Sequence, residues 1–519
     1  MNQPAGQEAL PGLESLPVVP QPDGAPTHSA RPRVRAVNRS QLSWQMLDVE
    51  RLIELDHPAR AIWELSGRLK LEGFYAPIEA VEGNAGRTPW DPRLLVSLWI
   101  YAYSRGIGSA REIARRCAYE PAFQWLCGLE EINHHTLSDF RVDHDASLRE
   151  LFVQVLGVLS SEGLVSLERV MHDGTRIKAN AGADSFRREE RLKKHLEAAR
   201  KQVEAMGDPR EEEPKRKRAA QERALRERRQ RLEQALEEVQ KARESKRQDK
   251  EQTRVSQSDP QSRIMKQSDG GYAPSYNVQL STEASHRIIV GAQVSQSPND
   301  FIHLIGAVAQ VEVNLGRKPA QVVVDAGFTS RENILTMAEQ SVDLIGPLAE
   351  ANLSWAGQQR QRGVSDKFDM DKFSYDAEKD VYRCPAGESL RHKGREFGPG
   401  TVIHKYTAKI ETCAACQFRS QCCPGNHYHG RSVTRSERSP ILTQFAEKMQ
   451  TEGAKAIYRQ RGAVAEFPNA WLKDKLGLKQ FRLRGLMKVR LEVLWAALTY
   501  NIQQWIRLSW RTKLALANN

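Results

Sequence analysis

The order of strand-like and helix-like segments between residues 169 and 348 constrains the fold of this chain more than any other feature. A short strand that ends at Asp173 is followed, after an insertion, by two β runs around a polar turn, a helix ended by Gly316, the apolar strand QVVV, and a further helix and strand. Strands that alternate with helices in this way pack as layers around a mixed sheet. We therefore predict an α/β fold.

Two segments interrupt this pattern. Residues 186–254 are dense in Glu, Lys, Arg, Ala and Leu, with GDPREEEP as a bend, which predicts a charged helical hairpin or short coiled coil. A solvated arm and a dedicated contact with DNA or a second subunit are both open interpretations. Residues 352–440 lack apolar periodicity, and we interpret them as an irregular, Cys-rich insertion.

Short helices precede the sheet. Residues 1–40 are rich in Pro, Gly and Ala and are expected to be a disordered leader, whereas residues 41–165 have helical periodicity. Asp91 and Ser109 are predicted N-caps, and a third helix is expected to carry Arg141 near its start. Basic residues at helix starts suit a DNA-docking module, although a plain helical bundle explains the periodicity equally well.

The net charge and the number of cysteines indicate which kind of partner this chain binds and in which cellular compartment it works. A net charge of +12 favours an anionic partner, of which nucleic acid is the commonest. The sequence has neither a signal-peptide pattern at its start nor a later apolar run long enough to cross a bilayer, so we expect a cytoplasmic protein without a membrane partner. Most of the seven cysteines lie within residues 384–423, which indicates a local cluster rather than a disulfide framework.

Aspartates follow two of the predicted strands: Asp173 in VMHDGT and Asp325 in VVVDAGF. Catalytic groups gather at strand ends in α/β sheets, but Asp-Gly is also a strong turn signal, so a turn remains an alternative for Asp173. Glu466 and Lys473 lie seven residues apart in YRQRGAVAEFPNAWLK, which places them about two turns apart on one helix face. Tyr458 and Arg461 lie on the preceding turns.

This inventory suits chemistry on a phosphodiester. Two divalent ions can generate the nucleophile and stabilise the leaving oxygen, and hard carboxylate ligands suit Mg²⁺. Arg176 and Lys178 are candidate contacts with a DNA backbone, with solvated strand residues as the alternative. Residues 473–490 hold seven Lys or Arg against one Asp and are a plausible track for DNA, or ordinary surface charge. The candidate DNA contacts in this stretch are Lys473, Arg482, Arg484 and Lys488.

The Cys-rich insertion has the spacing of a possible zinc site. Its candidate ligands are Cys384, Cys413, Cys416 and Cys422, and Cys423, His427 or His429 could replace one of them. Four thiolates can hold Zn²⁺ tetrahedrally and stabilise an insert that is too small to have its own core. Reduced thiols without metal are the alternative.

Several blocks, in order, resemble bacterial insertion-sequence transposases of the Asp-Asp-Glu (DDE) class. These are DHPAR, WDPRLLVSLWIYAYSRGIGSAREIARRC, TLSDFR, DGTRIKANAG, YNVQL, VVVDAGFTS and YRQRGAVAEFPNAWLK with FRLRGLMKVRLE. The resemblance spans about residues 45–505. It implies an RNase H-like catalytic domain in which Asp173 lies on the first strand, Asp325 follows the fourth, and Glu466 lies on a later helix, together holding Mg²⁺ or Mn²⁺.

Tyr458, Arg461 and Lys473 match the signature helix of that family, with one departure. Four residues separate Arg461 from Glu466, where the family often has three, and Pro468 follows closely. Glu452 and Glu492 are alternative third carboxylates.

The resemblance implies a transposase that binds the terminal inverted repeats of its element, cleaves DNA and joins the freed 3′-OH to target DNA. The expected domains are a helical DNA-binding domain (41–165), a catalytic domain (166–505) and a C-terminal tail (506–519). We expect double-stranded DNA as partner, a homodimer or larger assembly, and a location at the bacterial nucleoid. The alternatives are a non-catalytic DNA-binding protein with this fold and an RNase H-like nuclease without strand transfer.

Overall fold

The structure, a computed structural model, describes residues 46–80, 88–205, 215–244, 250–348, 362–424 and 429–517. The predicted leader, residues 1–40, lies outside these ranges. Residues 49–519 form one compact unit.

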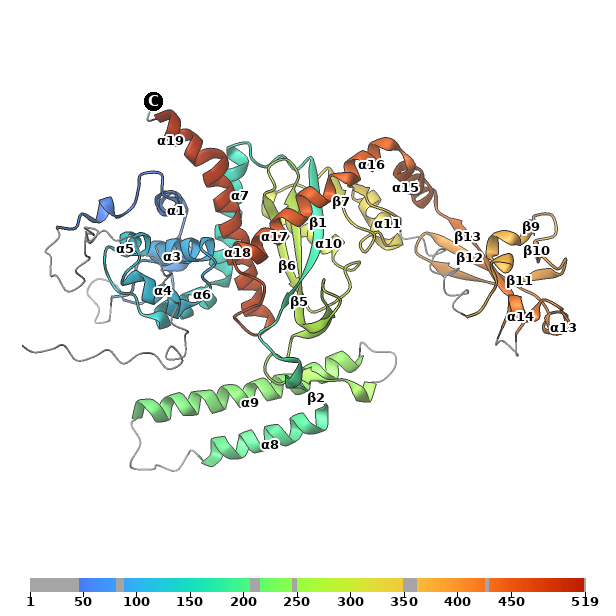
Figure 1. The fold of residues 1–519 in the computed structure, drawn as a ribbon, viewed down its shortest axis with the longest axis horizontal. Helices are drawn as coiled ribbons and strands as arrows, with labels where there is room; N and C mark the ends of the chain where they lie inside the picture. The colour runs from blue at the N-terminus through green and yellow to red at the C-terminus, as the bar shows by residue number, and fades with distance from the viewer. Residues whose placement is uncertain are drawn as a thin grey trace, which may run out of the picture. The chain divides into compact units, whose positions relative to one another are not determined.

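A mixed sheet lies at the centre of this unit (Figure 1). Its strands are β1 (Arg169–Lys178), β4 (Arg263–Lys266), β5 (Tyr272–Glu283), β6 (Ile289–Ser295), β7 (Gln321–Val323) and β8 (Asp343–Ile345). They are ordered β4-β5-β1-β7-β8, and β6 also pairs with β5. β1 is antiparallel to β5 and parallel to β7, which is parallel to β8, so the predicted α/β fold with a mixed sheet is confirmed.

Helices cover both faces of this sheet because its strand residues alternate between two apolar rows. Val322 and Leu344 pack with α10 (Leu304–Leu315) and α11 (Arg331–Glu339). Met171, Val323 and Ile345 point the other way and pack against residues of α16 (Glu452–Arg459) and of the π turn η6 (Gly462–Glu466). Helix α17 (Phe467–Asp474) continues this segment, which follows α15 (Pro440–Gln450).

The N-terminal helices are short, as predicted. They are α1 (Pro58–Arg68), α2 (Glu72–Tyr75), α3 (Pro92–Ser104), α4 (Ala110–Cys117), α5 (Pro121–Cys127), α6 (His134–Asp143) and α7 (Asp145–Ser161), after the 3-10 turn η1 (Val49–Leu52). Asp91 and Ser109 cap α3 and α4 as predicted. The expected place of Arg141 is wrong: Asn133 caps α6, so that helix starts early and Arg141 lies in its last turn, buried.

A long C-terminal helix joins these helices to the sheet. α18 (Leu486–Trp505) packs on α3, α7 and β6, and its Trp495 lies 6.5 Å from Trp99 between ring centroids. One apolar core therefore includes the N-terminal helices, β5, β6 and α18. The π turn η7 (Ile506–Trp510) and α19 (Arg511–Ala517) continue α18.

The charged insertion is a helical hairpin, as predicted (Figure 1). α8 (Glu189–Ala205) and α9 (Lys215–Glu244) share an apolar seam that includes Leu192, Leu232 and Val239. The short strands β2 (Phe186–Arg187) and β3 (Val255–Ser256) pair at its base, near the 3-10 turns η2 (Ala183–Ser185) and η3 (Lys250–Gln252).

The interpretation of residues 352–440 as irregular is wrong. They contain a five-stranded antiparallel sheet of β9 (Ser374–Asp376), β10 (Val381–Arg383), β11 (Ser389–Gly398), β12 (Thr401–Thr407) and β13 (Ser432–Arg438). The 3-10 turns η4 (Asp366–Phe368) and η5 (Met370–Lys372) and helices α13 (Ile410–Ala414) and α14 (Arg419–Cys422) complete it. Only a few strand residues, such as Leu390, Tyr406 and Val433, form its core, so the alternation in the sequence is weak.

Candidate functional site

The pairing register brings Asp173 and Asp325 to the same edge of the sheet. β1 and β7 are parallel, and their last paired residues are Met171 and Val323. Each aspartate lies two residues beyond the last β1–β7 pair. Because side chains alternate along extended backbone, both aspartates continue the row of Met171 and Val323, on the face covered by α16 and η6.

The prediction that the first strand ends at Asp173 is wrong. β1 continues to Lys178, and Asp173 pairs with Leu280 inside the β1–β5 ladder. The Asp-Gly pair is therefore in a strand, which excludes the hairpin-turn interpretation. β7 stops while β1 continues, so Asp173 lies where one side of β1 has lost its neighbour.

Arg461 joins the two aspartates. Its Nη2 lies 2.9 Å from Asp173 Oδ1 and 3.5 Å from Asp325 Oδ2. Asn469, two turns further along the chain, donates from Nδ2 to Asp173 Oδ2 at 3.0 Å. The side chain of Asp173 is 16% exposed and that of Asp325 is 40% exposed. Both oxygens of the more buried carboxylate are thus held by the C-terminal helical segment.

The pKa of Asp173 is raised to about 6. Burial is the largest cause; the charge of Arg461 opposes it, and the nearby carboxylates of Asp325 and Asp300 add to it. A carboxylate whose ionised form is disfavoured in this way gains stability from any further cation beside it.

Glu466 lies on the same helical segment as Arg461, but its side chain is exposed. It is the last residue of η6, a π turn, in which hydrogen bonds join residues five apart. The π turn accommodates the one extra residue between Arg461 and Glu466, and Pro468 lies in the first turn of α17, where its missing N–H is tolerated. Within the described residues, Glu466 has no ion pair with another side chain.

Asp173 and Asp325 supply hard oxygen ligands on one face, which fits a divalent ion such as Mg²⁺. Across the described ranges, no three His, Cys, Asp or Glu side chains are already grouped as a metal site. The structure thus joins the two aspartates through Arg461, and Glu466 stays a predicted third ligand.

Asp300 is a residue of this region that the sequence did not reveal. It accepts hydrogen bonds from Asn277 Nδ2 at 2.8 Å and from Gln279 Nε2 at 2.9 Å, and Arg176 Nη2 lies 3.3 Å away. Gln279 also contacts the buried His172 at 2.9 Å, whose pKa burial lowers to about 4. The polar run SPND before α10 was the available signal, but only the fold places it beside β1.

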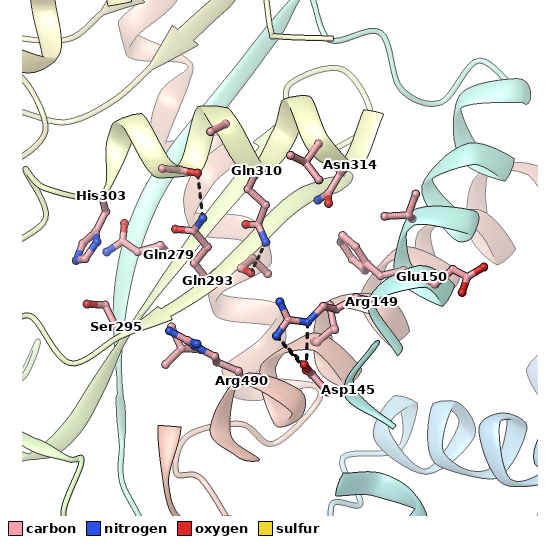
Figure 2. A pocket seen from close by; sticks show the side chains of 18 residues that line it. Asp145, Arg149, Glu150, Gln279, Gln293, Ser295, His303, Gln310, Asn314 and Arg490 are labelled. Carbon is pink, nitrogen blue, oxygen red and sulfur yellow. Dashed lines mark hydrogen bonds and ion pairs between the residues drawn. The ribbon is translucent and has the colours of Figure 1, made fainter. Parts of the chain in front are cut away.

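Gln279, which donates to Asp300, lines a groove of about 720 Å³ between α7, β6, α10 and α18 (Figure 2). Gln293 and Gln310 lie in it and donate to the backbone carbonyls of Gly306 and Ala292. These hydrogen bonds hold α10 against β6. Gln279, which also lines the groove, donates to Asp300. The groove is therefore continuous with the polar network behind Asp173.

The other predicted DNA contacts have different surroundings. Lys178, Arg482, Arg484 and Lys488 are exposed, and Tyr458 and Lys473 are half-buried. Burial lowers the pKa of Lys473, an effect that the charge of Asp173 opposes. Arg176 donates to Pro298 O as well as to Asp300, and Arg484 donates to Asn180 O.

The alternative third carboxylates are engaged elsewhere. Glu492 is buried and accepts the backbone N–H groups of Arg482 and Leu483. Glu452 is exposed and pairs with Lys455.

Five cysteines line one cavity of about 30 Å³ in the Cys-rich insertion. They are Cys384, Cys413, Cys416, Cys422 and Cys423. Burial raises the pKa of the Cys422 thiol to about 12 and also raises that of Cys423. His427 lies outside the described residues, and His429 lines a neighbouring cavity. Among the described side chains, no three His, Cys, Asp or Glu residues are grouped so that they could hold a metal ion, and the zinc site stays a prediction.

Comparison with known proteins identifies two matching families. Residues 383–506 match the transposase DDE domain family, and residues 47–143 match a family described as a transposase domain. No curated protein matches. A cryo-EM structure of the piggyBac transposase synaptic complex with hairpin DNA is similar at 8% identity over 87% of this chain and 76% of that chain. Its TM-score of 0.28 is below the level that indicates a shared fold.

The described helices include none that is long and apolar enough to span a membrane.

Proposed function

We propose that this chain, which carries a transposase DDE domain with an RNase H-like sheet and an N-terminal transposase domain, is the DNA transposase of an insertion sequence. It binds the terminal inverted repeats, cleaves a strand at each end and transfers the freed 3′-OH to target DNA. The observation that carries this proposal is the aspartate pair, Asp173 and Asp325, in register on one sheet face and joined through Arg461.

In this proposal Asp173, Asp325 and Glu466 hold Mg²⁺ or Mn²⁺. The ions supply activation of the attacking oxygen and stabilisation of the leaving oxygen when bound. Asn469 orients the Asp173 carboxylate, because it donates to the oxygen that Arg461 does not contact. Arg461 limits the repulsion between the aspartates.

Cations around the pair orient the DNA backbone. Lys473 is close enough to Asp173 for their charges to interact, and Tyr458 lies one turn before Arg461. The cationic surface continues through Lys178, Arg482, Arg484 and Lys488. Arg176 contacts the DNA backbone while it is held by its ion pair with Asp300. Such contacts fix the position of the duplex without reading its sequence.

The N-terminal helices, residues 41–165, recognise the inverted repeats, and two or more copies of the chain assemble on the two DNA ends. The protein acts on bacterial DNA at the nucleoid.

Incubation of the purified protein with labelled element ends and Mg²⁺, followed by sizing of the strands, tests the proposal. Wild-type protein cuts and joins, whereas Asp173→Ala and Asp325→Ala bind the ends without cutting them. Joined products distinguish transposition from simple nuclease action. If the wild type binds the ends without cleaving them, the alternative of a non-catalytic DNA-binding protein is favoured. Cleavage by either variant would refute the assignment of the catalytic residues.

A further inference from the structure

A second cavity, of about 730 Å³, lies between the N-terminal helices and the loop after α17. Its walls are the first turns of α4 and α6, Asn180 just beyond β1, and residues 477–482. The charged and imidazole side chains among its described lining residues are Arg111, Arg141, Lys479, Arg482, His134 and His135, with no carboxylate. The fully charged side chains of this lining are therefore all cations, of which Lys479 pairs with Asp474 at 2.9 Å.

The loop that carries Lys479 and Arg482 is fixed by backbone contacts to β1. The Phe481 N–H donates to Lys178 O at 2.8 Å, and the Lys178 N–H donates to Lys479 O at 3.4 Å. The buried Glu492 carboxylate accepts the N–H of Arg482 at 3.1 Å. Because this backbone is already ordered, it loses little conformational entropy when a ligand binds.

On the opposite wall, two helices begin at the cavity. Ser109 and Asn133 cap α4 and α6, and helix N-termini attract anions. Between them lies Arg141, which is 6% exposed. Its Nη1 donates to Gly108 O at 2.7 Å, while its buried Nε has no hydrogen-bond partner among the described residues. The buried Glu492 carboxylate compensates part of the charge of Arg141, so the exposed Arg111, Lys479 and Arg482 are the main attraction for an anion.

We infer that this cavity binds the phosphate backbone of duplex DNA at a fixed distance from the aspartate pair. The inference rests on the proposed function and adds the place where the backbone is held. Clustered cations, helix N-termini and small polar groups such as Ser138 are the groups that contact phosphates independently of sequence.

The distance follows from β1, which carries both sites. Asp173 and Lys178 are five residues apart on this strand, or about 17 Å at the usual rise. Lys178 is bridged to Gln480, which lines the cavity.

Equilibrium binding of the full-length protein to a labelled duplex of arbitrary sequence, measured at a series of salt concentrations, tests the inference. Arg111→Ala, Lys479→Ala and Arg482→Ala each remove one phosphate contact, so each lowers the slope of log affinity against log salt by about 1. Arg395→Ala, an exposed change on β11, is the matched control and leaves the slope unchanged.

Ser109 offers a second pair of variants. Asp and Asn both cap a helix well, so Ser109→Asp and Ser109→Asn preserve α4 and differ in charge. Ser109→Asp weakens duplex binding, and Ser109→Asn does not. Equal affinities for this pair, or unchanged slopes for the three cation variants, would overturn the inference. Neither outcome requires cleavage to be measured, so a failed inference is distinct from a failed proposed function, which appears as normal binding without cutting.

Discussion

Arg461 and Asp173, 288 residues apart in the sequence, lie in direct contact: the guanidinium Nη2 is 2.9 Å from the carboxylate Oδ1. The same nitrogen is 3.5 Å from Asp325 Oδ2, so one cation serves two acids from different strands. Arg461 thereby compensates part of the charge that the sheet edge concentrates.

Replacement of Arg461 should therefore change the ionisation of Asp173. Its charge opposes the burial that raises the pKa of Asp173, so Arg461→Ala raises this pKa further. The acid limb of the pH profile of DNA cleavage moves to higher pH, and Arg461→Lys, which keeps the charge, moves it less. Single-turnover cleavage rates across pH 5 to 9 measure the shift, and overlapping profiles for wild type and Arg461→Ala would contradict it.

The raised pKa of Asp173 also predicts how stability depends on pH without metal. Its folded pKa is about 6 against an ordinary value of 3.8, so between these values the native state binds more protons than the unfolded state. The contribution of Asp173 to stability is therefore greatest below pH 3.8 and is lost as pH rises to 6, by at most about 3 kcal/mol.

Asp173→Asn removes this titration. In EDTA, the free energy of unfolding of the variant relative to wild type should increase as pH rises from 4 to 6, as measured by urea denaturation. Mg²⁺ should reduce the difference, because the wild type alone gains a bound ion. A difference that does not vary with pH would show that Asp173 titrates normally.

The sequence pointed to the aspartates because strand-like runs precede both, but it could not predict that β1 continues past Asp173 or how the two strands align. Asp173 and Asp325 lie side by side only because Met171 pairs with Val323. These two strands are more than 140 positions apart in the sequence, so no local pattern reveals their pairing. Local signals succeeded where the cause is local, as for the caps Asp91 and Ser109.

Other parts were missed for physical reasons. The five-stranded sheet has so few buried positions that charged residues dominate its strands, and its alternation is hidden. Asp300 belongs to the site through hydrogen bonds from Asn277 and Gln279 and through its ion pair with Arg176, all on strands distant in sequence. Family resemblance supplied the role of Glu466, which no contact in the structure yet tests.

Gly174 should tolerate no side chain. A Cβ atom there would lie 2.5 Å from Gln279 Nε2 and 2.7 Å from Asp300 Oδ1, so Gly174→Ala must displace the network beside Asp173. We expect a loss of about 1–3 kcal/mol in stability and a large loss of cleavage. Gly453→Ala is the control, since a Cβ there meets open space at the start of α16. Thermal unfolding and cleavage assays compare them, and equal behaviour of the two variants would mean that the network is not rigid.

The third carboxylate can be tested with two glutamates of one helical segment. Glu466 and Glu452 are both exposed, but Glu452 pairs with Lys455 on the surface. If Glu466 joins the aspartates in holding a divalent ion, Glu466→Gln loses cleavage by several orders of magnitude and weakens Mn²⁺ binding, whereas Glu452→Gln changes neither. DNA affinity should not fall in either variant, because each removes a negative charge and neither removes a cation that contacts phosphate. Full cleavage by Glu466→Gln would remove it from the site and require another ligand beside Asp173 and Asp325. Loss of cleavage with unchanged Mn²⁺ binding would instead assign Glu466 a role in positioning DNA.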